Sequence, residues 1–242
     1  MSNFFNTILF EPLFNALIFL YQTIALKDLG LAIILLTILI RFILYPVFQK
    51  SIKDQRALQE IQPKLKKVQE EHKKDRVKQS EAMMALYKEH KLNPFSPFLT
   101  LIIQLPVLIT LYKVFRTILI PDFSKYLYSI TPIPQAINYS FLGLINLTQS
   151  NIFIVVLAVL AQYFQGKLSL PKKTNTGTLS TTEKMSQKMV LFAPVLTGVV
   201  LLSLPSALGL FWTMSSVFSI WQDWISRKHH QGQLDNIRKT TD

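Results

Sequence analysis

Arg41 is the only charged residue in the otherwise apolar segment 29–49, and it stands near the middle of that segment. A guanidinium at such a depth in a bilayer costs about 2.5–3.5 kcal/mol on insertion scales, so these residues normally face a partner or water. The chemistry open to it is electrostatic, because a cation can attract an anionic group without making or breaking a covalent bond. Arg41 is therefore the first candidate for a functional side chain.

We predict that Arg41 faces a hydrated cavity. Asp223 is the only acidic residue in the apolar segments and stands near the end of one, so a buried ion pair at the depth of Arg41 is not expected. Polar residues that could line or border the cavity are Thr37, Gln104, Gln162, Gln165, Trp212, Ser215, Ser216 and Ser219. The alternative is that Arg41 extends its side chain to the headgroups, because Pro46 and Lys50 follow within nine residues.

Most signatures of enzymatic chemistry are missing from the sequence. It contains no cysteine, which excludes disulfides, thiolate metal sites and thiol nucleophiles. Its four histidines show no metal-ligand spacing, and its seven glycines form no phosphate-binding loop. The sequence therefore predicts a protein that is not an enzyme and that uses neither a metal nor a cofactor.

The elements that must position Arg41 follow from composition. Of the 242 residues 50% are hydrophobic and only 17% are charged, whereas soluble domains carry about 25% charged residues. Five segments are long and apolar enough for membrane-spanning helices. They are residues 29–49, 92–116, 145–166, 189–204 and 205–226. The sequence thus predicts an all-α polytopic membrane protein, in which the last two spans form a tight pair.

The positive charge is distributed unevenly along the chain. The net charge is +12, and 21 of the 26 Lys and Arg residues fall in 50–91, 167–188 and 227–242. The segment 117–144 carries a single lysine, Lys125. By the positive-inside rule, 117–144 is an outer loop, the N-terminus lies outside, and 167–188 and the 227–242 tail are cytoplasmic. A sequence-specific nucleic-acid-binding protein would not show this alternation.

Residues 1–28 predict an amphipathic helix that lies in the outer interface before the first span. Glu11, Asn15 and Gln22 share one helix face. The opposite face carries Leu9, Leu13, Leu17, Leu20 and Ile24. A sixth span is the alternative for this segment.

Residues 50–91 predict a cytoplasmic antiparallel helical hairpin with a polar turn at 70–75. Apolar stripes run along both arms, at Leu58, Ile61, Leu65 and Val68 and at Val77, Met84 and Tyr87. Pro63 should kink the first arm or stand in its first turn. Its candidate docking residues are Lys64, Lys66, Lys67, Lys73 and Lys74. The alternative is a solvated spacer without a partner.

Several short motifs together resemble the YidC/Oxa/Albino-type membrane protein insertases, over about residues 10–229. The matching stretches are TILIRFILYP at 37–46, LQEIQPK at 58–64, MMALYK at 83–88, NP at 93–94, LIIQLPV at 101–107 and LPSALGLFW at 204–212. Ala207 departs from the family pattern, which has glycine there. The chain resembles a short bacterial form, since neither a periplasmic domain nor a lipoprotein cysteine is visible.

The resemblance implies a five-span core that inserts nascent membrane proteins into the lipid bilayer of a bacterial plasma membrane. Arg41 matches the groove arginine of the family and Thr37 a groove-lining position; either Gln162 or Gln165 matches a polar position of the third span. Trp212 falls at the second aromatic of the fifth span. The implied partners are ribosomes at the basic cytoplasmic parts, with the Sec translocon and signal recognition components as further candidates.

Two alternatives to an insertase remain open on the sequence. A small transporter or channel could pass a solute anion along Arg41, although such proteins usually carry internal repeats and none is visible here. A purely structural assembly partner would need Arg41 only at the headgroups.

Overall fold

The computed structural model describes residues 5–93, 96–170 and 181–241. At 96–101, 181–186 and 229–241 it describes the backbone only. Parts of four predicted segments, 1–28, 92–116, 167–188 and 227–242, therefore lie outside the described residues.

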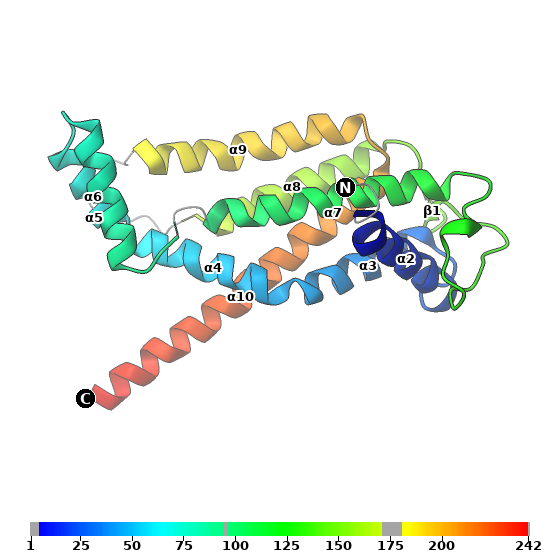
Figure 1. The fold of residues 1–242 in the computed structure, drawn as a ribbon, viewed down its shortest axis with the longest axis horizontal. Coiled ribbons are helices and arrows are strands. Elements are labelled where there is room, and N and C mark those ends of the chain that lie inside the picture. The colour runs from blue at the N-terminus through cyan, green and yellow to red at the C-terminus, as the bar shows by residue number, and fades with distance from the viewer. Residues whose placement is uncertain (1–4, 94–95, 171–180, 242) are drawn as a thin grey trace.

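The described chain is mainly helical (Figure 1). In order, its elements are η1 (Asn6–Phe10), α2 (Glu11–Thr23), α3 (Leu29–Ile43), α4 (Tyr45–Glu60), α5 (Gln62–Glu71), α6 (Arg76–Glu89), α7 (Ser96–Ile118), η2 (Ser124–Tyr126), β1 (Ser140–Phe141), β2 (Ile145–Asn146), α8 (Ile152–Leu168), α9 (Thr181–Leu202) and α10 (Ser206–Thr241). Helix α10 contacts α3, α4, α7, α8 and α9, and so holds the bundle together. The apolar core lies between α2, α3, α7, α8 and α10.

Among the described residues, one bent pair of helices is long and apolar enough to cross a membrane. Helices α3 and α4 together pass that test, across a break bent by 66°, while no described helix passes it alone. The predicted number of five spans stays a prediction.

Pro46 accounts for the bend between α3 and α4. It stands in the first turn of α4, where it has no N–H to donate to the preceding turn, and it restricts the backbone of Tyr45. The Tyr45 carbonyl accepts a hydrogen bond of 3.2 Å from the Gln222 amide of α10, which also donates to the Gln49 side chain at 3.3 Å. A local proline effect thus starts the bend, and a tertiary contact holds it.

The third predicted segment, 145–166, starts too early. Residues 145–146 form strand β2, which pairs antiparallel with β1, and helix α8 begins only at Ile152. Asn151 explains the delay, because its side chain accepts a hydrogen bond from Phe153 N at 2.9 Å and caps the helix. Apolar composition alone did not reveal this start.

The predicted faces of the N-terminal helix are partly wrong. Asn15, predicted on the polar face, is only 5% exposed, so the prediction is wrong at this position. The buried face consists of Phe10, Phe14, Leu17, Ile18 and Tyr21. Helix α2 packs against α3, α7 and η2, so its burial pattern follows these neighbours. Whether the helix lies in an interface stays a prediction.

Helices α5 and α6 pack against each other and run antiparallel. The Gln79 amide donates to the Gln69 carbonyl at 2.8 Å, and Lys64 Nζ lies 3.0 Å from His90 Nε2. Pro63 stands in the first turn of α5, one of the two positions predicted for it. Burial raises the pKa of the Tyr87 phenol on α6.

The contact between α5 and α6 uses only part of the predicted apolar stripes. Ile61 and Leu65 are buried, as the first stripe predicts. Val77 is 68% exposed and Met84 44% exposed, so the second stripe was wrong at these two positions. Met83 lies nearer the first arm, since its sulfur accepts from the Gln69 amide at 3.8 Å. The second arm is short, so the sequence pattern did not determine which of its residues face the first arm.

Gly209 allows α8 and α10 to approach closely. A Cβ at this position would lie 2.8 Å from Cγ2 of Ile154, closer than side-chain carbons normally come. We expect Gly209→Leu to destabilise the protein by about 1–3 kcal/mol through overpacking, and to lower the midpoint of thermal unfolding in detergent. Val217→Leu, at an exposed position of the same helix, is the control. Equal midpoints for the two variants would show that the close approach is not needed.

Candidate functional site

A cavity of about 400 Å³ opens between α3, α4, α7, α8, α9 and α10. Eight of the nine predicted residues line it, namely Arg41, Gln104, Gln162, Gln165, Trp212, Ser215, Ser216 and Ser219. The structure therefore brings together residues that stand on four segments far apart in the sequence.

Arg41 points into the bundle. It is 6% exposed, and its guanidinium carbon lies 4.4 Å from the ring centroid of Phe48. Arg41 is in the last turn of α3 and Phe48 in the first turns of α4, so the bend at Pro46 sets this cation–π contact. The side chain thus does not extend along the surface as the headgroup alternative requires.

Three buried polar side-chain atoms make no hydrogen bond within the described part of the chain. They are Arg41 Nη1, Ser215 Oγ and Gln222 Oε1, and all three residues line the cavity. Buried polar groups are nearly always hydrogen-bonded, to protein or to water. Their concentration at one cavity indicates a site suited to water or to a polar ligand.

Both glutamines of α8 line the cavity, so the sequence alternatives Gln162 and Gln165 do not exclude each other. Gln162 Oε1 accepts a hydrogen bond of 3.1 Å from Trp212 Nε1, which fixes the indole at the border of the cavity. Trp212 and Gln162 thereby form a polar link between α10 and α8.

Thr37 was predicted to line the groove and does not belong to the cavity wall. It is 1% exposed, and its hydroxyl donates to the Ile33 carbonyl of its own helix at 2.6 Å. A threonine hydroxyl inside a helix can form its hydrogen bond to a backbone carbonyl of the preceding turn in this way. Spacing from Arg41 correctly put Thr37 on the same face of α3, one turn away, but its side chain is buried there and is not part of the cavity wall.

Helix α4 supplies wall residues that the sequence analysis missed. Phe48, Ser51, Ile52 and Gln55 all line the cavity. The first predicted span ends at residue 49, and residues 50–91 were predicted to form the hairpin. The spacing of these four residues at three or four positions is a helical face, and it was the signal available in the sequence.

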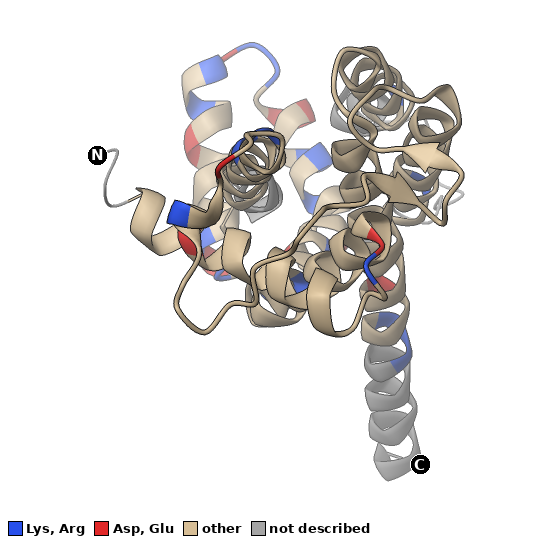
Figure 2. Cartoon of the chain, turned by 90° about the vertical axis from the view of Figure 1, so that its right-hand side faces the viewer, with Lys and Arg blue, Asp and Glu red and all other residues tan. Residues whose placement is uncertain are grey.

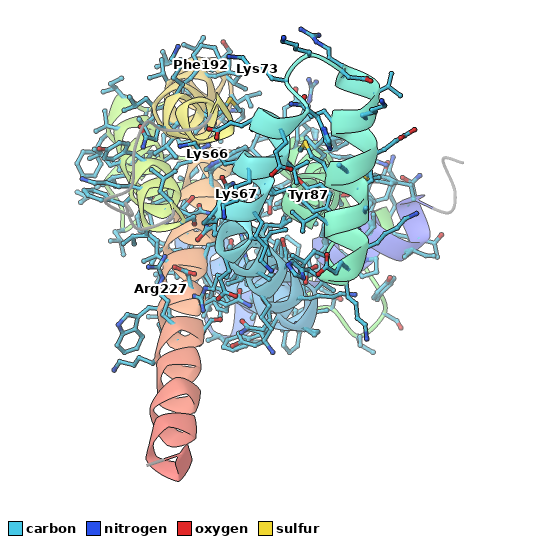
Figure 3. The ribbon with its side chains drawn as sticks, turned by 90° about the vertical axis from the view of Figure 1, so that its left-hand side faces the viewer. Lys66, Lys67, Lys73, Tyr87, Phe192 and Arg227 are labelled. Atoms are coloured by element: carbon cyan, nitrogen blue, oxygen red, sulfur yellow. The ribbon has the colours of Figure 1, made fainter. Side chains whose placement is uncertain are left out.

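Helix α9 presents an apolar outer surface beside the cavity. Its Met189, Val190, Ala193 and Pro194 line the cavity. Leu191, Phe192 and Val195 are each more than half exposed, and Phe192 lies on the outer surface of the helix (Figure 3). One helix therefore separates a polar interior from an apolar exterior.

The predicted docking lysines lie at one end of the molecule, on α5 and the turn after it. Lys64, Lys67, Lys73 and Lys74 are exposed, and Lys66 is half-buried (Figure 3). The loops and strands at the opposite end carry few charged residues (Figure 2). Among the side chains that the structure describes, no group of three His, Asp or Glu could hold a metal ion.

The chain is similar to proteins of known name. The model of the family described as 60Kd inner membrane protein matches residues 19–233. The membrane protein insertase YidC of Francisella tularensis subsp. novicida (strain U112) is 34% identical over 202 residues, which are 84% of this chain and 33% of that protein. The same values hold for YidC of F. tularensis subsp. tularensis (strain WY96-3418). This chain thus spans about a third of the length of these curated relatives.

A solved structure has a similar fold. It is described as an active YidC insertase crystal structure with the first transmembrane domain resolved, and it matches with a TM-score of 0.57 and 25% sequence identity. The match covers 88% of this chain and 44% of that one. Because the family model covers most of its length and the aligned fold agrees, this chain belongs to the 60Kd inner membrane protein family, the YidC/Oxa type.

Proposed function

We propose that the protein is a membrane protein insertase and chaperone of a bacterial plasma membrane. It draws polar or acidic segments of nascent membrane proteins into the cavity around Arg41 and releases their helices sideways into lipid. The observation that carries this proposal is the buried Arg41, which lines a cavity together with Gln and Ser side chains and whose Nη1 has no hydrogen-bond partner in the described chain.

The physical benefit is a shorter apolar path for the polar segment. An unsatisfied polar group transferred into hydrocarbon costs several kcal/mol, and a charge costs more. Polar side chains and water in the cavity would replace part of the lost hydration, and Arg41 would attract carboxylates. Insertion makes and breaks no covalent bond, so the proposed function requires neither enzymatic catalysis nor a cofactor.

Sideways release is supported by α9. Its Pro194 lines the cavity while the neighbouring Val195 is exposed on the outer surface. A client helix that leaves the cavity past α9 would meet apolar side chains throughout, which match its own surface. In the proposed topology the N-terminus is outside, the C-terminus is cytoplasmic, and the basic pair α5–α6 faces the cytoplasm.

Reconstitution tests the proposal directly. Purified protein in liposomes is presented with a short client that has an acidic N-terminal tail, and protection of the tail from added protease is measured. We expect protected tail only in vesicles that contain the protein. Equal protection in empty vesicles, or none in either, would contradict the proposed function. Flux of a small radiolabelled anion through the same vesicles tests the transporter alternative.

The docking lysines make a separate prediction. Replacing Lys64, Lys66, Lys67, Lys73 and Lys74 together by Gln should weaken binding to ribosomes about tenfold at physiological salt, because each lost contact with a phosphate lowers the affinity and its salt dependence. Co-sedimentation of protein-containing nanodiscs with ribosomes measures this. Lys27→Gln with Lys125→Gln, which lie outside α5 and α6, is the control. Unchanged co-sedimentation of the variant with all five lysines replaced would favour the spacer alternative.

A further inference from the structure

A cluster of three charged side chains lies at the edge of the cavity. Asp223 of α10 lines the cavity, and its carboxylate joins Arg56 of α4 and Arg227 of α10. Arg56 Nη2 lies 2.7 Å from Asp223 Oδ1, and Arg227 Nε lies 2.8 Å from Asp223 Oδ2. Each carboxylate oxygen thus takes a different guanidinium.

The cluster is partly shielded from solvent. The side chains of Asp223, Arg56 and Arg227 are 14%, 19% and 38% exposed. Both arginines are also held by backbone carbonyls, since Arg56 Nη2 donates to Asp223 O at 2.8 Å and Arg227 donates to Leu168 O. These carbonyl contacts orient the two guanidinium groups by a second interaction besides the carboxylate.

Two oriented guanidinium groups around one carboxylate have the chemistry of a carboxylate-binding site. Charge-assisted hydrogen bonds of this kind are about twice as strong as neutral ones. Two cations at this spacing repel each other unless an anion lies between them. Asp223 supplies that anion, and it is the only acidic residue among the residues that line the described cavity.

We propose that Arg56 and Arg227 form a second anion-binding site at the edge of the cavity, which Asp223 occupies in the resting protein and from which an acidic residue of a client displaces it. The inference rests on the proposed function, because it gives the acidic client segment a first contact before Arg41. Asp223 thereby acts as a built-in competitor, which lowers the affinity of the site for acidic client segments and does not affect neutral ones.

Equilibrium peptide binding tests the proposal without any insertion step. The protein is held in nanodiscs, and fluorescence anisotropy follows a labelled peptide with four glutamates among glycine and serine, next to the same peptide with four glutamines. All measurements use the Arg41→Ala background, so that binding at Arg41 does not contribute. We expect D223N to bind the glutamate peptide at least about tenfold more tightly, because two guanidiniums lose their internal counter-ion.

Three comparisons decide the outcome. D223N should leave binding of the glutamine peptide unchanged, D223N/R56Q should lose the gain, and D223E, which keeps the carboxylate, should show none. A cluster that only clasps α4 to α10 would change both peptides equally or neither, and that result overturns the proposal. Both peptides are measured on the same protein sample. A partly unfolded variant would lower the binding of both peptides equally, so the difference between the peptides still decides the outcome.

This result is separable from the proposed function. Insertion by the wild-type protein together with unchanged peptide binding by D223N would refute only the second anion site. Failure of the wild-type protein to insert any client would refute the insertase proposal, whatever the peptides do.

Discussion

Arg41→Ala is expected to reduce insertion of a client with an acidic translocated tail at least about tenfold, equivalent to about 1.4 kcal/mol. Two unit charges 4 Å apart attract by about 4 kcal/mol at an effective dielectric constant of 20, and a wet cavity screens part of that. The measured quantity is the rate at which the tail becomes protease-protected in liposomes. A client with glutamines in place of the acidic residues should lose much less.

The variant should fold normally. The Nη1 atom of Arg41 is buried and makes no hydrogen bond within the described chain. Removing this desolvated charge leaves no buried partner unpaired, so it does not destabilise the protein as the loss of one member of an ion pair does. Arg41→Lys should retain part of the activity, because the charge remains while the planar geometry is lost. Full activity of Arg41→Ala on the acidic client would refute the electrostatic role.

Thr37→Val is the matched control for Arg41. Thr37 lies one turn before Arg41, is almost completely buried and bonds to its own helix, so the substitution keeps its shape and removes no wall residue. We expect unchanged insertion. A loss as large as that of Arg41→Ala would show that Thr37 reaches the client after all, as the family resemblance implies.

Asn15→Ala is the second substitution with a large expected effect, here on stability. The Asn15 amide donates to the carbonyls of Glu11 at 2.8 Å and Tyr126 at 2.9 Å. Its carbonyl accepts from Tyr128 N at 2.7 Å and from the Thr131 hydroxyl at 2.8 Å. Each buried group left without a partner costs about 1–3 kcal/mol, so we expect a loss of at least about 2 kcal/mol.

The loss should be concentrated in the segment that Asn15 holds. Three of its four hydrogen bonds reach residues 126–131, so limited proteolysis there should accelerate in Asn15→Ala along with the fall in melting midpoint. Gln22→Ala, at a less buried polar position of the same helix, is the control. If both variants melt and cleave alike, Asn15 does not anchor this segment.

Arg41 could be singled out because its cost in an apolar segment is a strong physical signal, and it lines the cavity; that the cavity is hydrated stays a prediction. The prediction for Asn15 failed because helical spacing identifies faces but not their neighbours. Asn15 stands on the face that was expected to be polar, and three of its four partners are more than a hundred positions away in the chain. Thr37 failed for a related reason, since its hydroxyl is satisfied locally and needs no cavity.

The sequence by itself determined the helical character, the separation of the basic segments and the residue types available for a groove. It could do so because composition, charge distribution and helical periodicity are local properties of the chain. The tertiary structure alone decided that the bend at Pro46 turns Phe48 over Arg41, and that α4 contributes a wall of the cavity. It alone placed Arg56 and Arg227 on either side of Asp223. Long-range packing decides such contacts, and a one-dimensional pattern contains no distance between α4 and α10.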